Sequence, residues 1–468
     1  MSELATLSAL DAAAKVRSGE VSARAVVEAT LARIAALNPK LGAFTDVTAE
    51  RALARAEALD AARARGETLG PLAGATFAVK NLFDVKGLPT RAGSKINRER
   101  APANADSPLI ERLEAAGAIL VGALNMGEYA YDFTGENAHD GPSRNPHDLG
   151  HMSGGSSGGS GSAVGGGLVA LALGSDTNGS IRVPAALCGI FGLKPTYGRL
   201  SRARSFPFVS SFDHLGPFAR SVGDLAAAYD AMQGVDPEDP GQTPRAVEPT
   251  LGALGEGAAG LRIATLGGYF AKGAAPEVLA GLERVARALG ATRVVEMPEA
   301  DRARAAAFLI TMAEGGALHL DRLKTRATDY DPDTRDRLLA GAILPAAWVV
   351  KAQKFRRWFR AQTLELFRDV DVLLAPATPV CAPALGQKTF RLDGAEIPVR
   401  ANLGLFTQPI SFIGLPVVAV PLWQKGLFLP TGCQVIAPPW REDLALRVAA
   451  QLEREGVCRA PIGRAAEV

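Results

Sequence analysis

The segment GGSSGGSGSAVGGG, at 154–167, constrains the fold of this chain more than any other. It contains eight glycines and four serines. Runs of this composition are usually flexible linkers, and a linker here would divide the chain into two domains. The neighbouring segments, however, have the patterns of ordered helices and strands, and a second unusual run, GSDTNGSIRVPA, follows at 174–185. The alternative is that both runs are loops of one site inside a single domain.

Strand-like and helix-like segments alternate along the rest of the chain. Short apolar runs with the length of buried strands are TFAVK (76–80), LVALALGSD (168–176), DVLLAPATP (371–379) and LPVVAVPLW (415–423). Longer segments with apolar residues at helical spacing lie between and after them, including 354–370 and 442–455. This alternation predicts an α/β protein with a mixed β-sheet core flanked by helices, an α/β/α arrangement.

We expect one domain over 1–468. Its expected parts are N-terminal helices over 1–65, a core over 70–225, a mostly helical region over 226–370, and C-terminal strands and a helix over 371–468. In the first part, Ser22 is a candidate N-cap of a helix that should stop at Asn38 and Pro39.

The charge balance and the apolar pattern exclude several classes of protein. Lysine and arginine number 51 and aspartate and glutamate 49, so the formal net charge is only +2. This balance gives no basic field for nucleic acid. No apolar run approaches the roughly 18 residues of a membrane span, and the N-terminus lacks the pattern of a secretory signal. We expect a cytoplasmic protein that binds neither nucleic acid nor a membrane.

The cysteines give no sign of disulfides or of a metal. No two of them form a C-x-x-C pair, and no cluster of ligands at short spacing suggests zinc. We therefore expect free thiols, no metal and no cofactor, with cysteines at Cys188, Cys381, Cys433 and Cys458.

Two familiar motifs are tempting in the glycine-rich segment, and both are weak. GGSSG and GSSGG match the G-x-S-x-G elbow of α/β-hydrolases, but no strand precedes them and such matches are common in so repetitive a run. A histidine base would also be needed, from among His139, His147, His151, His214 and His319. No G-x-x-x-x-G-K-[ST] occurs, and G-x-G-x-x-G fails because Val164 stands where its last glycine is needed.

A serine and a lysine offer a better hypothesis. The run 174–185 places Ser180 in a turn after a strand, where free backbone N–H groups could hold an oxyanion. A serine hydroxyl is a poor nucleophile unless a base takes its proton. Lys80 ends the TFAVK strand, and burial can lower a lysine pKa by several units from about 10.4. A neutral lysine could then accept the proton through a second serine from the glycine-rich loop.

The residues that carry this hypothesis resemble the amidase signature family. The matching segments are AVKN at 78–81, GGSSGGS at 154–160 and GSDTNGSIRVPAALCGIFGLKPTYGRLS at 174–201, and the similarity extends over essentially the whole chain. The resemblance implies a Ser-cisSer-Lys triad in which Ser180 is the nucleophile, Ser156 the relay and Lys80 the base. The cis peptide would join Gly155 to Ser156.

The same resemblance implies further roles. The oxyanion would be held by the N–H groups of Ser180 and of Thr177, Asn178 and Gly179. Residues that support the lysine and the loops would be Gly155, Ser157, Asp176 and Arg182. The chain departs from the family in two places: Asn178 replaces a commoner glycine, and SGSAVGGG replaces the usual SAAAVAAG. Since glycine costs about 1 kcal/mol in a helix, we expect this helix to be locally weak.

Within the family, the chain is most similar to the 1-carboxybiuret hydrolase group. Val183 favours this group over the large amidase-type chain of the glutamyl-tRNA amidotransferases. This implies hydrolysis of a small linear amide with release of ammonia. Another small-amide hydrolase, such an amidotransferase chain and an inactive scaffold are the alternatives.

The resemblance also suggests how the substrate is held and which partners the chain has. Arg337 matches the position of a substrate-carboxylate arginine, and Tyr131 matches the pocket mouth. A solvated helix face and a core aromatic are the respective alternatives. The region 226–370 would lie on the substrate side. An oligomer and a small helical partner subunit are implied as well.

Overall fold

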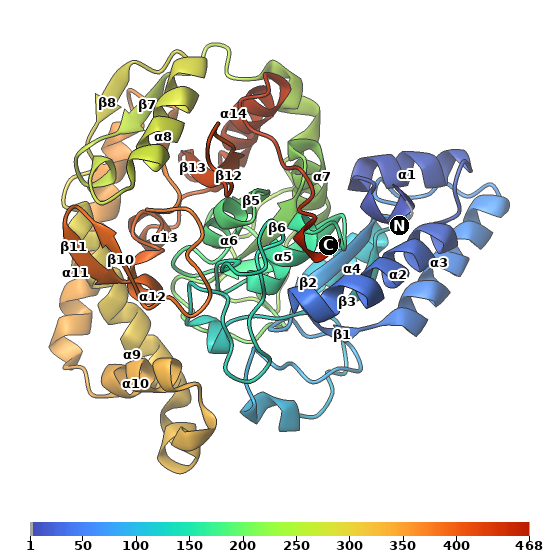
Figure 1. Cartoon of the computed structure of the whole chain (residues 1–468), viewed down its shortest axis with the longest axis horizontal. Helices are drawn as coiled ribbons and strands as arrows, with labels where there is room; N and C mark the ends of the chain where they lie inside the picture. The colour runs from blue at the N-terminus through green and yellow to red at the C-terminus, as the bar shows by residue number, and fades with distance from the viewer. Residues whose placement is uncertain (1–2, 468) are drawn as a thin grey trace.

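The computed structural model describes residues 3–467, which build one large central sheet with helices on both sides (Figure 1). The sheet has 11 strands in the order β1-β3-β2-β4-β6-β5-β12-β13-β9-β7-β8. Its strands are β1 (Phe44–Val47), β2 (Thr76–Lys80), β3 (Ile119–Leu124), β4 (Leu171–Asp176), β5 (Phe191–Lys194), β6 (His214–Ala219), β7 (Ile263–Leu266), β8 (Arg293–Val295), β9 (Val372–Pro376), β12 (Val417–Leu422) and β13 (Thr431–Ile436). A separate hairpin consists of β10 (Thr389–Leu392) and β11 (Ala395–Pro398).

The α-helices connect these strands. They are α1 (Ala9–Ser18), α2 (Ala23–Leu41), α3 (Ala49–Ala64), α4 (Pro108–Ala115), α5 (Gly158–Gly165), α6 (Arg182–Leu187), α7 (Val222–Met232), α8 (Pro276–Ala288), α9 (Ala300–Arg326), α10 (Pro332–Ala342), α11 (Ala346–Leu366), α12 (Val399–Asn402), α13 (Gln408–Phe412) and α14 (Glu442–Arg454). Figure 1 shows α1, α2 and α3 beside β1, β2 and β3 at one end of the sheet, with β7, β8 and α8 at the other.

The two faces of the sheet pack against different helices. Along β2, Phe77 and Val79 belong to the apolar cluster that includes residues of α4, α7 and α14. Ala78, between them, belongs to the cluster formed by α2, α3, α5 and α6. This alternation is the period of a strand buried on both faces. The sheet mixes parallel and antiparallel pairs, since β4 is parallel to β2 but antiparallel to β6. The predicted α/β/α class with a mixed sheet is therefore confirmed.

Local structure departs from the expectations at three places. Residues 44–47 interrupt the N-terminal helices as β1, which pairs with β3 at the sheet edge. Helix α2 does not stop at Asn38 and Pro39 but continues to Leu41, where the N–H of Gly42 bonds to the carbonyl of Asn38. Proline is tolerated here because only the last turn loses a hydrogen bond. The region 226–370, which was expected to be mostly helical, also contributes β7 and β8. These strands have only 4 and 3 residues, so the sequence pattern of the helix between them hides their own.

The glycine-rich segment is not a linker, because it folds into α5 inside the protein. All residues of α5 are buried. A Cβ atom at Gly159 would lie 2.5 Å from the carbonyl oxygens of Ala43 and Asn125. One at Gly165 would lie 2.8 Å from Cγ of Pro146. The glycines thus let other segments approach the helix backbone, and this packing offsets the weak helix propensity of the sequence.

The structure also bears on the expectations that the chain has no membrane span and that its cysteines are free thiols. Taken singly, no helix between residues 3 and 467 is long and apolar enough to cross a membrane, although α10 and α11, bent by 96°, pass that test as a pair. The four cysteines are all free, as expected.

Substituting Gly159 by alanine should destabilise the protein by about 1–3 kcal/mol, because the new methyl group overlaps two backbone oxygens. Urea unfolding followed by circular dichroism measures this change. The matched control is Gly252→Ala, where a Cβ meets nothing within 4 Å. Equal stability of the two variants would contradict the packing role of Gly159.

Candidate active site

A lysine and two serines meet where strands β2 and β4 end. These strands are parallel neighbours, so their last residues lie at the same edge of the sheet. Lys80 is the last residue of β2, and its Nζ lies 2.7 Å from Oγ of Ser156 and 2.8 Å from Oγ of Ser175. All three side chains are buried. A neutral amine can donate an N–H to one hydroxyl while its lone pair accepts from the other.

The environment of Lys80 favours this neutral form. Burial lowers the pKa of Lys80 to about 7, although nearby carboxylates, Asp213 first among them, act in the opposite direction. A lysine with this pKa is about half neutral at pH 7 and can act as a base, whereas an ordinary lysine is almost fully protonated.

The loop before α5 brings Ser156 to the lysine. The peptide bond between Gly155 and Ser156 is cis, as predicted. A Cβ at Gly155 would lie 2.5 Å from Oδ2 of Asp132, so only glycine fits. Ser157 accepts the N–H of Ser175 and donates to its carbonyl oxygen, at 3.3 and 3.1 Å. Ser157 thereby joins this loop to β4, while its hydroxyl makes no hydrogen bond to the lysine.

A buried ion pair shapes the turn that contains Ser180. Asp176 and Arg182 form a two-point contact, with Nε and Nη2 of the arginine each 2.9 Å from a carboxylate oxygen. Both side chains are fully buried. Burial opposes ionisation of Asp176, but Arg182 holds the pKa of this carboxyl well below its usual range. Arg182 also donates to the side chains of Gln434 and Ser411 and to the carbonyl of Thr407.

The backbone of the same turn presents free donors. Within residues 3–467, the N–H groups of Thr177, Asn178, Gly179 and Ser180 donate no hydrogen bond to the protein. The turn is fixed from outside by Thr407, whose hydroxyl donates to the carbonyl of Asn178 at 2.7 Å. Gly179 has φ +141°, and a Cβ there would lie 2.1 Å from the same hydroxyl. Such a fixed group of N–H donors can stabilise negative charge on a substrate oxygen.

Ser180 lines a small pocket together with Tyr131, Asn178, Arg337 and Arg400. The guanidinium of Arg337 lies 4.3 Å from the ring centre of Tyr131. Its Nη2 atom is buried and has no hydrogen-bond partner within residues 3–467. The same is true of Nη1 of Arg400, whose Nε lies near the carboxylates of Asp333 and Asp132, at 3.3 and 3.6 Å.

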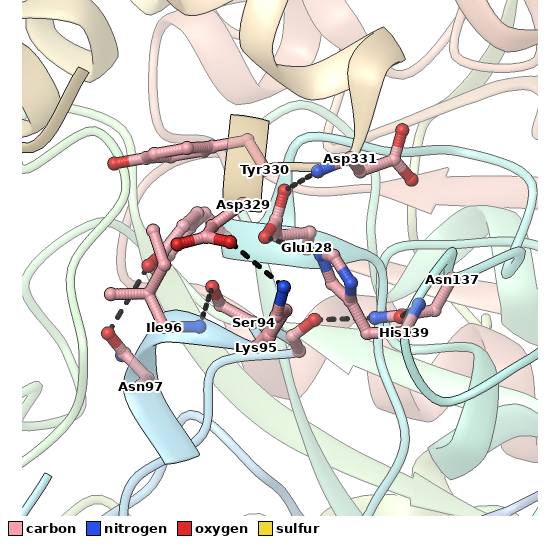
Figure 2. A network of polar contacts seen from close by, with 12 residues as sticks. Ser94, Lys95, Ile96, Asn97, Glu128, Asn137, His139, Asp329, Tyr330 and Asp331 are labelled. Atoms are coloured by element: carbon pink, nitrogen blue, oxygen red, sulfur yellow. Dashed lines mark hydrogen bonds and ion pairs between the residues drawn. The ribbon is translucent and has the colours of Figure 1, made fainter. Parts of the chain in front are cut away.

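A polar network holds the pocket wall against α10, the helix of Arg337. Figure 2 shows Glu128 between His139 and Asp331: its Oε1 lies 3.0 Å from Nε2 of His139, and its Oε2 accepts the N–H of Asp331 at 2.7 Å. Asp331 is the N-cap of α10. The Lys95–Asp329 ion pair, at 2.9 Å, adds a second contact just before the helix. Since Glu128 is only three residues from Tyr131, this network couples the two sides of the pocket.

The structure gives no support to a histidine base. Within residues 3–467, no histidine ring hydrogen-bonds a serine. The ring nitrogens have other partners, which are Glu128 for His139, Cys188 for His147, Asp148 for His151, Asp176 for His214 and Tyr330 for His319. In the same residues, no three His, Cys, Asp or Glu side chains are grouped in a way that could hold a metal ion.

The sequence predicts one site for Lys80, Ser156 and Ser180. The structure places Lys80 and Ser156 in hydrogen-bond contact, and Ser180 lines a pocket with Asn178, Tyr131 and Arg337. Ser175 and Arg400, which also belong to the site, were not predicted. Ser175 precedes Asp176 within the run already singled out, and its place at the end of a strand parallel to that of Lys80 was a usable signal. Arg400 lies in α12, in a segment without any motif, and only the tertiary structure brings it to the pocket.

The chain is similar to known proteins over most of its length. The amidase family profile matches residues 25–446. The chain is 55% identical to AtzE, a 1-carboxybiuret hydrolase subunit of Pseudomonas sp. (strain ADP), over 95% of this chain and 97% of the relative. It is 40% identical to the A-type subunit of the glutamyl-tRNA(Gln) amidotransferase of Anaeromyxobacter dehalogenans (strain 2CP-C), over 97% of each.

A solved structure described as a vestigial protein complex that reveals the evolutionary origins of an s-triazine catabolic enzyme is also similar. It has a TM-score of 0.96 and 53% identity, covering 97% of this chain and 100% of that one. The chain therefore belongs to the amidase signature family. It is a hydrolase of that family, and the predictions of family, fold and enzyme class are confirmed.

Substituting Arg182 by methionine should lower the free energy of unfolding by about 3–5 kcal/mol, because it leaves the Asp176 carboxylate buried without its partner. Urea unfolding measures the loss. Arg335→Met is the matched control, since Arg335 pairs with Asp336 at the surface, where ion pairs contribute little. A variant as stable as the wild type would show that the pair does not hold the turn.

The pH dependence of amide hydrolysis should follow the protonation of Lys80. Below pH 7, kcat/KM should fall about tenfold per pH unit, because the proton occupies the lone pair that the reaction needs. Ammonia release between pH 5 and 9 measures the profile, with Ser180→Ala as the background. A rate that stays constant down to pH 5 would rule out a neutral lysine base.

Proposed function

We propose that this chain hydrolyses 1-carboxybiuret, a small linear amide with a carboxylate at one end, and releases ammonia. The observation that carries the proposal is the pair of arginines in the pocket of Ser180. Arg337 and Arg400 both line this pocket, and each has a buried guanidinium nitrogen without a hydrogen-bond partner within residues 3–467. Buried donors of this kind call for an acceptor, and a carboxylate is the acceptor that a guanidinium binds best.

The two arginines are close enough to affect each other. Burial lowers the pKa of Arg337, and repulsion by Arg400 adds to this effect. Arginine nevertheless stays protonated in proteins, so the pocket keeps two positive charges at neutral pH. The carboxylate of a substrate would relieve their repulsion.

The proposed reaction begins at Ser180. Its hydroxyl oxygen attacks the carbonyl carbon of the terminal carbamoyl group, and its proton passes through Ser156 to Lys80. The free N–H groups of the turn 177–180 hold the negative oxygen of the tetrahedral intermediate. The C–N bond then breaks and ammonia leaves with the proton returned by Lys80 and Ser156. A water molecule hydrolyses the acyl-enzyme by the same steps and releases a dicarboxylate.

Ser175 orients the base in this scheme. Its Oγ, 2.8 Å from Nζ, accepts an N–H of the neutral lysine. The lone pair of the amine is then directed toward Ser156, which lies at 2.7 Å. A second partner for the lysine thus makes one direction of proton transfer favourable.

The substrate is tested by offering 1-carboxybiuret, biuret, butyramide and glutamine in parallel and measuring ammonia. We expect kcat/KM to be highest for 1-carboxybiuret. Arg337→Gln and Arg400→Gln should each raise KM for 1-carboxybiuret about 10- to 100-fold, because each removes a charged hydrogen bond, and should change KM for biuret much less.

The control for these variants is Arg335→Gln, on the same helix as Arg337 but paired with Asp336. Turnover of another amide without turnover of 1-carboxybiuret would overturn the proposed substrate. Glutamine as the best substrate would favour the amidotransferase alternative.

We also infer that the chain works with a partner subunit. Its relative is itself called a subunit, and the similar solved structure is described as a complex. Ile343 and Trp348, at the turn from α10 to α11, expose 83% and 52% of their surface, and a partner bound at this turn would bury both side chains. Figure 1 shows this turn at one end of the molecule, away from the central sheet.

A further inference from the structure

The side chain of Asn178 has a function that the triad does not explain. Asn178 is buried in the pocket of Ser180. Its Nδ2 donates to Oγ1 of Thr311, on α9, at 3.0 Å. Its Oδ1 is buried and accepts no hydrogen bond within residues 3–467. Buried polar atoms almost always have a partner, so this oxygen points to a ligand that supplies one.

The direction of this oxygen is fixed before any substrate binds. Thr311 is itself buried and holds the amide nitrogen of Asn178. Thr407 holds the backbone carbonyl of the same residue at 2.7 Å. The side chain and the backbone of Asn178 are thus each held by a residue from another part of the chain, and the unpaired Oδ1 is fixed in one position. Rigid acceptors of this kind give selectivity, because ordering them costs nothing on binding.

The position of Asn178 limits which atom of the substrate it can meet. Its backbone N–H belongs to the donors that would hold the carbonyl oxygen under attack, so its side chain lies beside the group attached to that carbonyl. In a ureido amide this group is an N–H, which can donate to Oδ1. In an aliphatic amide it is a methylene, which leaves Oδ1 buried and unpaired. The commoner glycine of the family has no such acceptor.

We propose that Oδ1 of Asn178 accepts a hydrogen bond from the substrate N–H next to the scissile carbonyl, and that it makes the enzyme select ureido amides over aliphatic amides. This inference rests on the proposed function and names the group that selects its substrate class. A site with an acceptor for a substrate N–H discriminates strongly against analogues that lack it.

Biuret and malonamide provide the sharpest test, because they differ only in the central N–H or methylene. Wild-type enzyme should prefer biuret. Asn178→Ala should lower kcat/KM for biuret about 10- to 100-fold and that for malonamide less than about threefold, so that the preference is lost. Thr311→Val should shift the same ratio in the same direction by a smaller factor. Thr363→Val, a buried helical threonine outside the pocket, is the control and should leave the ratio unchanged.

The ratio separates recognition from a merely structural role. An equal loss on both amides would mean that Asn178 acts only on the turn that holds the oxyanion, and would overturn the proposal. Any other result in which Asn178→Ala leaves the ratio of kcat/KM for biuret to that for malonamide unchanged would overturn it as well. Turnover of biuret without turnover of 1-carboxybiuret would contradict the proposed substrate alone, since the comparison of biuret with malonamide would still decide the role of Asn178.

Discussion

The buried ion pair between Asp176 and Arg182 is the interaction on which the rest of the site depends. The two residues are six positions apart and lie on either side of the turn that holds Ser180. Their two-point contact therefore closes this turn, while the remaining guanidinium donors reach Thr407, Ser411 and Gln434. One arginine thus connects the nucleophile's turn with segments more than two hundred residues further along the chain. Because a buried charge without its partner is strongly unfavourable, this arrangement is hard to relax into another.

Much of the fold could be predicted from the sequence, since it follows from local patterns. The strand TFAVK begins and ends at the residues expected, and its lysine is placed by that strand. Long-range packing explains the exceptions. Strands β7 and β8 are too short to have a clear period, and they exist because β7 pairs with β9 and β8 pairs in turn with β7. Helix α2 passes through Pro39 because Leu37 and Leu41, on either side of it, are both buried in the same apolar cluster.

The candidate site divides in the same way. Lys80, Ser156 and Ser180 stand in motifs and could be assigned from a resemblance. Thr311 and Arg400 stand in none. Helix α9 brings Thr311 to Asn178 and helix α12 brings Arg400 to the pocket, and no local pattern determines the positions of these helices. The glycine-rich run shows why composition alone misleads. Glycine gives flexibility where water surrounds the chain, but in the interior it permits the closest contacts between backbones.

The pocket draws its catalytic groups and its two arginines from different halves of the chain. The groups for bond cleavage lie between residues 80 and 180, around the ion pair, whereas Arg337 and Arg400 belong to α10 and α12. Helix α10 meets the first half through a few polar contacts, such as that of Glu128 with Asp331. Substitutions in α10 or α12 can therefore change which amide is accepted while the hydrolytic apparatus stays intact. Such a division means that a new substrate preference does not require any change in the residues that cleave the amide bond.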